Sequence, residues 1–304
     1  MLRGPDWLDR AEFPFVSRFW PGRHGNLHYV DEGQGETLLF VHGNPTWSFM
    51  FRKQIAALRD RYRCVAIDHL GFGLSDKPKA APYGPRLHSE NLSQFISVLD
   101  LRNLTLVLHD WGGPIGMAYA LDHPDNVARL VIANTHFWSL KGIRGAEIFS
   151  RVVGGPIGRV LCRRFNAFPR YVMKAVYGRS GTLPPEIHRH YMAPFLTPDS
   201  RHGPYCFAKA IIGESEWLAG LWSRRHILQT KPLQIIWGME DPVGTPDKLR
   251  RWEAAFPDHR TAVLDDFGHF VPEQLGSDMA RIVAAFVEEV GSEVCPDPRR
   301  QRRR

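Results

Sequence analysis

Asp110 stands where the sequence best places a reactive side chain. The apolar run at residues 104–109 predicts a buried strand, and two glycines shortly after Asp110 open a predicted helix. Such a sharp strand-to-helix turn is the setting of a nucleophile elbow, and a helix N-terminus favours an anion. A carboxylate is already anionic at neutral pH and can displace a leaving group from saturated carbon. Asp110 is the predicted nucleophile, although an isolated Asp at such a turn is more often a helix N-cap.

Three other motifs supply partners for this nucleophile. The run His-Gly-Asn44-Pro follows an earlier apolar strand, in a turn that can present a backbone N–H to an oxyanion. Asp241 comes just after a later strand, and His269 lies in a glycine-bearing loop before the final helix. The chain order is thus nucleophile, acid, base. We predict that Asp241 orients His269 and that His269 is the general base.

These side chains stand at the ends of predicted strands that alternate with helices. The apolar runs cover residues 38–42, 64–68, 104–109, 130–134, 233–237 and 261–264. Helical periodicity covers residues 47–58, 88–99, 115–121, 246–255 and 278–290. The strand runs are apolar on both faces, as expected for parallel strands covered by helices. The sequence predicts an α/β fold with a mostly parallel central sheet flanked by helices.

Residues 136–228 interrupt this alternation. The segment is rich in proline and glycine, and its apolar residues follow no strand period. We expect a helical cap at 136–228, inserted between two parts of one core at 1–135 and 229–294, and a basic disordered tail at 295–304. The aromatic residues of the cap are candidates for an apolar pocket or for the core of the cap itself, with Trp138 the best placed for the pocket: Phe137, Trp138, Phe149, Phe165, Phe168 and Phe207.

Composition and charge indicate an ordinary globular protein. Of 304 residues, 43% are hydrophobic and 23% are charged. The net charge of +7 falls to +2 without the five arginines that end the chain: Arg299, Arg300, Arg302, Arg303 and Arg304. In the rest of the chain the Lys and Arg residues nearly equal the Asp and Glu residues in number. Because the basic tail is short and lacks aromatic residues, we expect no nucleic-acid partner.

The cysteines form no metal or redox motif. Cys64, Cys162, Cys206 and Cys295 are scattered and contain no Cys-x-x-Cys pair, so we expect buried free thiols rather than disulfides or a zinc site. No stretch has the pattern of a secretory signal or approaches the ~20 apolar residues of a membrane span. We expect a cytoplasmic protein without a membrane span. The sequence gives no indication of its oligomeric state.

Taken together, the motifs resemble the haloalkane dehalogenases of the α/β-hydrolase superfamily. The similarity covers nearly the whole chain, residues 10–292, and includes the turn Asp68-His-Leu-Gly-Phe-Gly-Leu-Ser-Asp-Lys-Pro. It implies that the Asn44 amide and the Trp111 indole N–H hold a leaving halide, while the backbone N–H groups of these two residues hold the oxyanion. No carboxylate follows the run 130–134 before Glu147. This absence favours the branch of the family with an Asp-His-Asp triad.

The resemblance also implies a reaction. A halogenated alkane and water would give a primary alcohol, a halide ion and a proton, through an alkyl ester on Asp110. It implies no metal ion and no organic cofactor.

Other functions remain open. An epoxide hydrolase uses the same elbow with two cap tyrosines, for which the candidates are Tyr171, Tyr177, Tyr191 and Tyr205. Asn44 stands where those enzymes typically carry an aromatic or apolar residue, and a fluoroacetate dehalogenase would carry Arg in place of Trp111. A non-catalytic ligand receptor of the same fold is the alternative from another class. The other polar residues near the motifs are predicted to be structural: His42, His109, Asp265 and Asp266.

Overall fold

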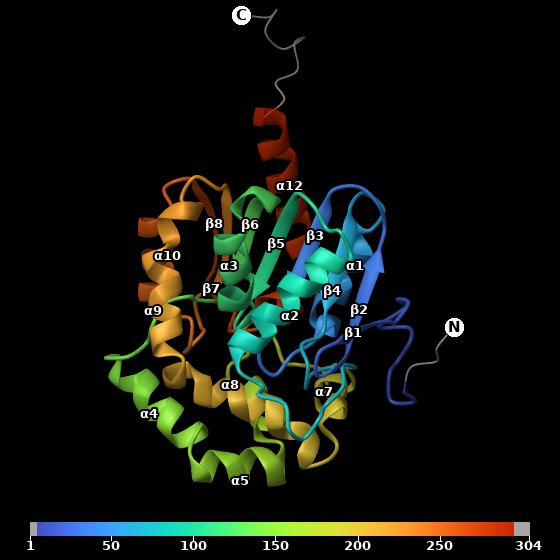
Figure 1. Ribbon diagram of the computed structural model, residues 1–304, viewed down its shortest axis with the longest axis vertical. Helices are drawn as coiled ribbons and strands as arrows, with labels where there is room; N and C mark the ends of the chain where they lie inside the picture. Colours follow the sequence, from blue (N-terminus) through green and yellow to red (C-terminus); the bar gives the residue numbers. More distant parts are fainter. Residues whose placement is uncertain (1–4, 295–304) are drawn as a thin grey trace, which may run out of the picture.

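An eight-stranded sheet forms the centre of the molecule (Figure 1). The computed structural model describes residues 5–294. The strands are β1 (Arg18–Gly22), β2 (Gly25–Glu32), β3 (Thr37–Val41), β4 (Arg63–Ile67), β5 (Leu104–His109), β6 (Val127–Ala133), β7 (Leu233–Gly238) and β8 (His259–Leu264). Their order across the sheet is β1-β2-β4-β3-β5-β6-β7-β8. Strand β2 pairs antiparallel with β1 and β4, and the other pairs are parallel.

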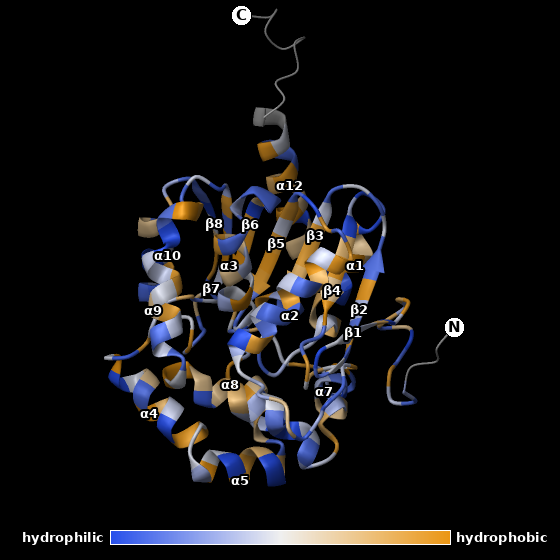
Figure 2. Cartoon of the chain, viewed as in Figure 1, coloured by the Kyte–Doolittle hydropathy of each residue, from blue (hydrophilic) through white to orange (hydrophobic). Residues whose placement is uncertain are grey.

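Helices cover both faces of this sheet. One face packs on α1 (Arg52–Leu58) and α12 (Ser277–Val294), and the other on α2 (Pro85–Val98), α3 (Gly112–Asp122) and α10 (Pro246–Ala255). In β5, Leu106 and Leu108 pack toward α2 and α3, whereas Val107 packs toward α1 and α12. Burial on both faces explains why the strand runs are continuously apolar. Figure 2 shows the central strands largely in orange and the loops at the sheet ends mostly in blue.

The chain between β6 and β7 forms helices and no strand of the sheet. These helices are α4 (Arg144–Val153), α5 (Pro156–Phe165), α6 (Met173–Ala175), α7 (Pro185–Met192), α8 (His202–Gly213) and α9 (Ser215–Ser223). The Trp47 indole N–H donates to the His190 carbonyl at 3.0 Å, which ties α7 to the turn after β3. We propose 136–228 as the bounds of this insertion, within one core formed by 1–135 and 229–294. In Figure 1, α4, α5 and α8 lie at the opposite end of the molecule from the end of α12.

The predicted α/β architecture is confirmed. Predicted strands coincide with β3 to β8 to within a few residues, and the helix predicted at 246–255 matches α10 (Pro246–Ala255). The antiparallel pair β1 and β2 was not predicted, because its mixed, partly exposed residues carry no continuous apolar run. The short helix α11 (Val271–Leu275) precedes α12. The predicted tail at 295–304, with Cys295, lies outside the described residues.

The cysteines and the helix lengths bear on two further expectations from the sequence. Cys64, Cys162 and Cys206 are free thiols; the first two are buried as expected, whereas the expectation is wrong for Cys206, which is only partly buried on α8. Within residues 5–294, we find no helix of the length and apolar character that crossing a bilayer requires.

Candidate active site

Asp110 occupies the sharp turn between β5 and α3. Its backbone φ of +50° lies in the left-handed region, which is strained for any residue with a side chain. The turn is held in place because the Gly113 N–H donates to the Asp110 carbonyl at 2.9 Å and the Thr135 hydroxyl donates to the same oxygen. A Cβ at Gly43 would collide with the Asp110 carboxylate. Glycine at that position therefore lets the turn after β3 approach the candidate nucleophile.

Each oxygen of the Asp110 carboxylate faces a different partner. Oδ1 accepts a hydrogen bond from the Asn44 backbone N–H at 2.6 Å. Oδ2 lies 3.4 Å from Nε2 of His269, and the side chain of Asp110 is 16% exposed. Within residues 5–294, the Trp111 backbone N–H has no hydrogen-bond acceptor. The structure thus brings the predicted nucleophile, base and first oxyanion donor together, with a second N–H beside them.

His269 bridges Asp110 and Asp241. Its Nδ1 lies 2.7 Å from Oδ2 of Asp241, which follows β7, while its Nε2 faces Asp110. All three side chains come from turns at the carboxyl ends of parallel strands. The Asp241 hydrogen bond fixes a proton on Nδ1 and leaves Nε2 directed at the nucleophile. This is the geometry required of a nucleophile, a base and an orienting acid.

The electrostatics of the three groups are coupled. Burial disfavours a charged imidazole, but the Asp241 and Asp110 carboxylates outweigh burial and raise the pKa of His269 to about 10. Burial also disfavours charge on Asp110, yet hydrogen bonding and attraction from His269 lower its pKa to about 2. The pKa of Asp241 is lowered, since His269 overcomes the cost of burial. These shifts favour an imidazolium between two carboxylates in the resting site.

Asn134 is a site residue that the sequence analysis did not identify. It follows β6, and its Nδ2 donates to Oδ2 of Asp241 at 2.9 Å and to the Gly238 carbonyl at 3.0 Å. Its Oδ1 accepts the Gly238 N–H at 2.8 Å. Asn134 therefore ties the loop after β7 to the end of β6 and gives Oδ2 of Asp241 a second donor beside His269. The available signal was a polar residue that ends an apolar run at the same edge of the sheet.

The side chains of Asn44 and Trp111 both contact α8. Asn44 Nδ2 donates to the Pro204 carbonyl of α8 at 3.3 Å. An amide nitrogen carries two hydrogens, so one remains for another acceptor. The Trp111 ring stacks on Phe207 of α8 with 5.4 Å between ring centroids, and its indole N–H has no acceptor within residues 5–294. Both side chains therefore retain an N–H donor, on two residues that adjoin Asp110: Asn44 through its backbone N–H and Trp111 in the chain.

The neighbouring histidines make backbone contacts. His109 Nε2 donates to the His269 carbonyl at 2.9 Å, and burial lowers the pKa of His109 to about 4. His42 Nδ1 donates to the Gly43 carbonyl at 2.8 Å, while its Nε2 accepts the His69 N–H at 2.9 Å. These two neutral rings hold the loops that carry His269 and Asn44. Asp265 and Asp266 are exposed, and the latter pairs with Arg179 rather than with the base.

The aromatic residues of the insertion divide between core, site and surface. Trp138 is 1% exposed and packs against Trp222 and Trp252, so it belongs to the core rather than to the pocket. Phe137 packs beside it, and Phe168 packs in a separate cluster with Cys162. The pocket candidates Phe149 and Phe165 are 39% and 50% exposed on the outer surface. Phe207 alone of the six contacts a site residue, through its stack on Trp111.

Comparison with known proteins places this geometry in a family. The family model for the alpha/beta hydrolase fold matches residues 36–274. The chain belongs to the alpha/beta hydrolase family. The chain is 38% identical to haloalkane dehalogenase 2 of Mycobacterium tuberculosis (strain ATCC 25618 / H37Rv), over 93% of this chain and 98% of that protein. This similarity confirms the resemblance to haloalkane dehalogenases that the motifs indicated.

A second kind of curated relative is also similar to this alpha/beta hydrolase. It is the cis-3-alkyl-4-alkyloxetan-2-one decarboxylase of Shewanella oneidensis, 33% identical over 91% of this chain and 89% of that protein. Among solved structures, haloalkane dehalogenase DbeA from Bradyrhizobium elkani superposes with a TM-score of 0.84 at 22% identity, covering 92% of this chain and 99% of that one. That structure supports the fold, and the curated relatives leave two reactions to be distinguished.

Proposed function

We propose that this alpha/beta hydrolase is a haloalkane dehalogenase that acts through an ester on Asp110. The observation that supports this most directly is a carboxylate at the elbow, Asp110, which accepts the Asn44 backbone N–H and faces His269, while the side chains of Asn44 and Trp111 each retain an N–H donor. A serine at the elbow attacks acyl groups, whereas a carboxylate displaces leaving groups from saturated carbon. Its substrates are then a small halogenated alkane and water, with a halide ion among the products. No step requires a metal ion or an organic cofactor.

In the first step, a carboxylate oxygen of Asp110 attacks the carbon that bears the halogen. The new C–O bond forms as the carbon–halogen bond breaks, and the halide leaves with the bonding electron pair. Negative charge grows on the halogen, so N–H donors from Asn44 and Trp111 stabilise the transition state more than the neutral substrate. The product is an alkyl ester of Asp110.

In the second step, His269 removes a proton from water and the oxygen attacks the carboxyl carbon of the ester. The backbone N–H groups of Asn44 and Trp111 then stabilise the oxyanion. The tetrahedral intermediate collapses, the alcohol leaves, and the Asp110 carboxylate is restored. Esterification removes the negative charge that helps to hold a proton on His269. After the first step the ring releases its proton to solvent, which is the proton among the products, and only then becomes a competent base.

The decarboxylase relatives favour a second candidate function. A cis-3-alkyl-4-alkyloxetan-2-one is a strained cyclic ester, and Asp110 is chemically competent to attack such a ring. Nothing in the contacts of Asp110 distinguishes this reaction from dehalogenation, so the two are separated by products.

The remaining alternatives receive less support. An epoxide hydrolase needs cap tyrosines directed at the opening epoxide. Tyr171 is 56% exposed, Tyr191 donates to Glu273, and Tyr205 donates to the Gly154 carbonyl at 2.9 Å. Burial, together with the Glu273 carboxylate, raises the pKa of the Tyr177 hydroxyl. A non-catalytic receptor would have no use for a histidine held between two carboxylates.

One set of assays separates these functions. Purified enzyme and its Asp110→Ala variant are incubated with 1-bromobutane, 1,2-dibromoethane, styrene oxide and a cis-3,4-dialkyloxetan-2-one. Release of halide that depends on Asp110 is the expected result. Alkene and carbon dioxide without halide would establish the decarboxylase, diol without halide would establish the epoxide hydrolase, and no product would favour the receptor.

A further inference from the structure

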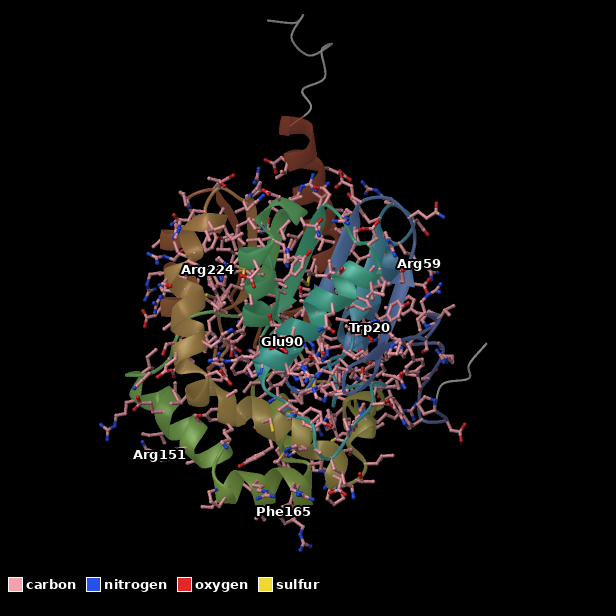
Figure 3. All side chains as sticks on the ribbon, in the orientation of Figure 1. Trp20, Arg59, Glu90, Arg151, Phe165 and Arg224 are labelled. Carbon is pink, nitrogen blue, oxygen red and sulfur yellow. The ribbon has the colours of Figure 1, made fainter. Side chains whose placement is uncertain are left out.

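Helices α4 and α5 expose large apolar side chains on the side that faces away from the sheet. Six of these side chains, which we call the outer cap face, are between 43% and 68% exposed: Ile148, Val152, Ile157, Val160, Leu161 and Phe165. Isolated apolar residues on a surface are ordinary, but a contiguous group marks a site of interaction. Figure 3 labels Phe165 on α5 and Arg151 on α4, both at the end of the molecule farthest from the end of α12.

The spacing in α5 shows that this exposure is organised. Ile157, Val160, Leu161 and Phe165 follow the i, i+3, i+4, i+8 pattern of one helix face, the pattern that normally turns toward a protein core. Here the buried residues are Gly158 and Cys162 instead. The apolar stripe of α5 therefore points to the outside of the molecule.

Positive charge surrounds this face. Residues 144–174 contain seven Lys and Arg and a single acidic residue, Glu147. Arg163 pairs with Asp199 at 2.6 Å. The other six basic residues of this stretch have no acidic partner within 4.0 Å among residues 5–294: Arg144, Arg151, Arg159, Arg164, Arg170 and Lys174. The near balance of charge in the body of the chain thus conceals an uneven distribution. The insertion 136–228 holds fourteen Lys and Arg against five Asp and Glu.

A hollow beside the outer cap face is lined by four basic residues of the insertion, of which Arg163 is paired with Asp199. It has a volume of about 810 Å³ and lies between α5 and α8, where Arg159, Arg163, Arg164 and Lys209 line it. Tyr205 and Val160 also line the hollow, so it opens directly beside the apolar stripe. A site with four cations next to apolar side chains matches a molecule that is anionic at one end and apolar at the other.

We propose that α4 and α5 dock this protein on the surface of an anionic phospholipid bilayer. The outer cap face enters the boundary between headgroups and acyl chains, and the hollow receives headgroup phosphates. Amphipathic helices with large apolar residues and a basic polar face bind membranes in this manner, and anionic lipids strengthen the binding through each nearby Lys or Arg. The insertion lies on the membrane without crossing it.

Helix α8 connects this surface to the active site. Pro204 and Phe207 contact Asn44 and Trp111, whereas Tyr205 and Lys209 of the same helix line the hollow. Docking through the outer cap face would hold the covering of the active site against the lipid, where apolar molecules concentrate. The proposal does not depend on which reaction Asp110 performs, because no residue of the outer cap face or the hollow takes part in the chemistry.

Vesicle flotation tests the proposal on the full-length protein. Vesicles of phosphatidylcholine alone are compared with vesicles that contain phosphatidylglycerol, at low and high salt. We expect binding to the anionic vesicles only, with loss of binding at high salt. Combining Ile157→Ser, Val160→Ser and Phe165→Ser should weaken binding at least about tenfold. Combining Arg159→Gln, Arg164→Gln and Lys209→Gln should weaken it by on the order of a hundredfold.

Matched variants on the core serve as controls. Val98→Ser with Val263→Ser replaces exposed apolar residues of α2 and β8, and these variants should bind as the wild type does. Arg102→Gln, Arg250→Gln and Arg281→Gln together remove three exposed cations elsewhere on the core. Catalytic turnover of a water-soluble substrate verifies that every variant is folded, since none of these residues lies in the active site.

Several results would overturn the proposal. These are equal binding to neutral and anionic vesicles, no binding to either, or binding that the outer-face and hollow variants leave unchanged. Full-length protein with its five terminal arginines replaced by glutamine tests the tail, and complete loss of binding in that variant would assign the interaction elsewhere. Light scattering without lipid provides the last comparison. If the wild type forms an oligomer that the outer-face variants dissociate, and no variant binds vesicles, then the outer cap face binds a second copy of the chain instead of a membrane.

Discussion

Asp110 and His269 form an ion pair whose charge must change during the proposed reaction. With Asp110 ionised, the two carboxylates beside the ring raise the pKa of His269 to about 10. The imidazolium in turn lowers the pKa of Asp110 to about 2, which keeps the nucleophile ionised over the whole physiological range. Alkylation of Asp110 neutralises one carboxylate and releases the base. The two steps are thus ordered by electrostatics within the site.

The His269→Ala variant should separate these steps. Asp110 can still be alkylated, but no base remains to activate water, so the ester accumulates. We expect one alkyl group per protein by mass spectrometry and a fall in turnover of at least about a hundredfold. The Asp110→Ala variant should show neither adduct nor turnover. Normal turnover by the His269 variant would show that another group is the base.

Trp111→Phe tests the indole N–H at the halogen. Phenylalanine retains a ring to stack on Phe207 but has no donor, so the first step should slow by about a hundredfold. Rapid-mixing measurements of the first halide burst report this step directly. Trp217→Phe, on α9 and outside the site, is the matched control. An unchanged burst rate in Trp111→Phe would remove Trp111 from the halide site.

At the scale of elements, the site is assembled where parallel strands end at one edge of the sheet. Asp110 follows β5, Asn134 follows β6, and Asp241 follows β7, so neighbouring strands deliver residues that are far apart in the chain. The Asn134 amide links the last two of these ends. Correct placement of Asp241 therefore depends on the junction between β6 and β7 as well as on its own loop.

Removing the Asn134 side chain should loosen this junction. Asn134→Ala deprives Asp241 of one donor, and a hydrogen bond to a charged group contributes about 1.5–3 kcal/mol. We expect kcat to fall roughly tenfold to a hundredfold and the pH dependence of kcat to shift, while KM changes little. Asn126→Ala is the control, because Asn126 bonds to Leu101 and Tyr119 at the amino end of β6. A kcat equal in the two variants would leave Asn134 with a purely structural role.

At the scale of the whole molecule, the buried charges make stability depend on pH. The folded pKa of His269 is raised from 6.5 to about 10, so the folded state keeps a proton that the unfolded chain loses. The stabilisation that this proton gives the folded state is fully present below pH 6.5 and disappears as pH rises through about 10. The lowered pKa of Asp110 affects stability in the acidic range. Its stabilising contribution is fully present above pH 3.8 and is lost as pH falls toward 2.

Urea unfolding between pH 6 and pH 10 measures the first of these effects. The free energy of unfolding should be higher for the wild type than for His269→Ala. The difference should be largest at pH 6, where it reaches up to a few kcal/mol. The difference should shrink steadily toward pH 10, because each unit of pKa shift corresponds to about 1.4 kcal/mol. A difference that stays constant over this range would mean that His269 is not held protonated in the folded protein.

The sequence by itself determined the fold class and the three residues of the candidate triad. Continuous apolar runs arise because parallel strands are buried on both faces, so β3 to β7 could be predicted from local pattern. The edge strand β8 has an apolar run as well, although it is only partly buried. Strand β1, in which Arg18 and Phe19 are exposed and only Trp20 is buried, carries no such pattern and is defined by pairing with β2. Asp110, Asp241 and His269 were found because each interrupts an apolar run or a glycine-bearing turn with a side chain suited to catalysis.

Tertiary structure alone decided which other side chains belong to the site. Asn134 became a partner of Asp241, and Trp138 joined the core, because both outcomes depend on which strand ends and helices meet in space. Phe165 turned outward for the same reason: helical periodicity indicates that α5 has an apolar face but not the direction of that face. Side-chain pattern follows from local geometry, whereas the choice of neighbour follows from packing between segments distant in the chain.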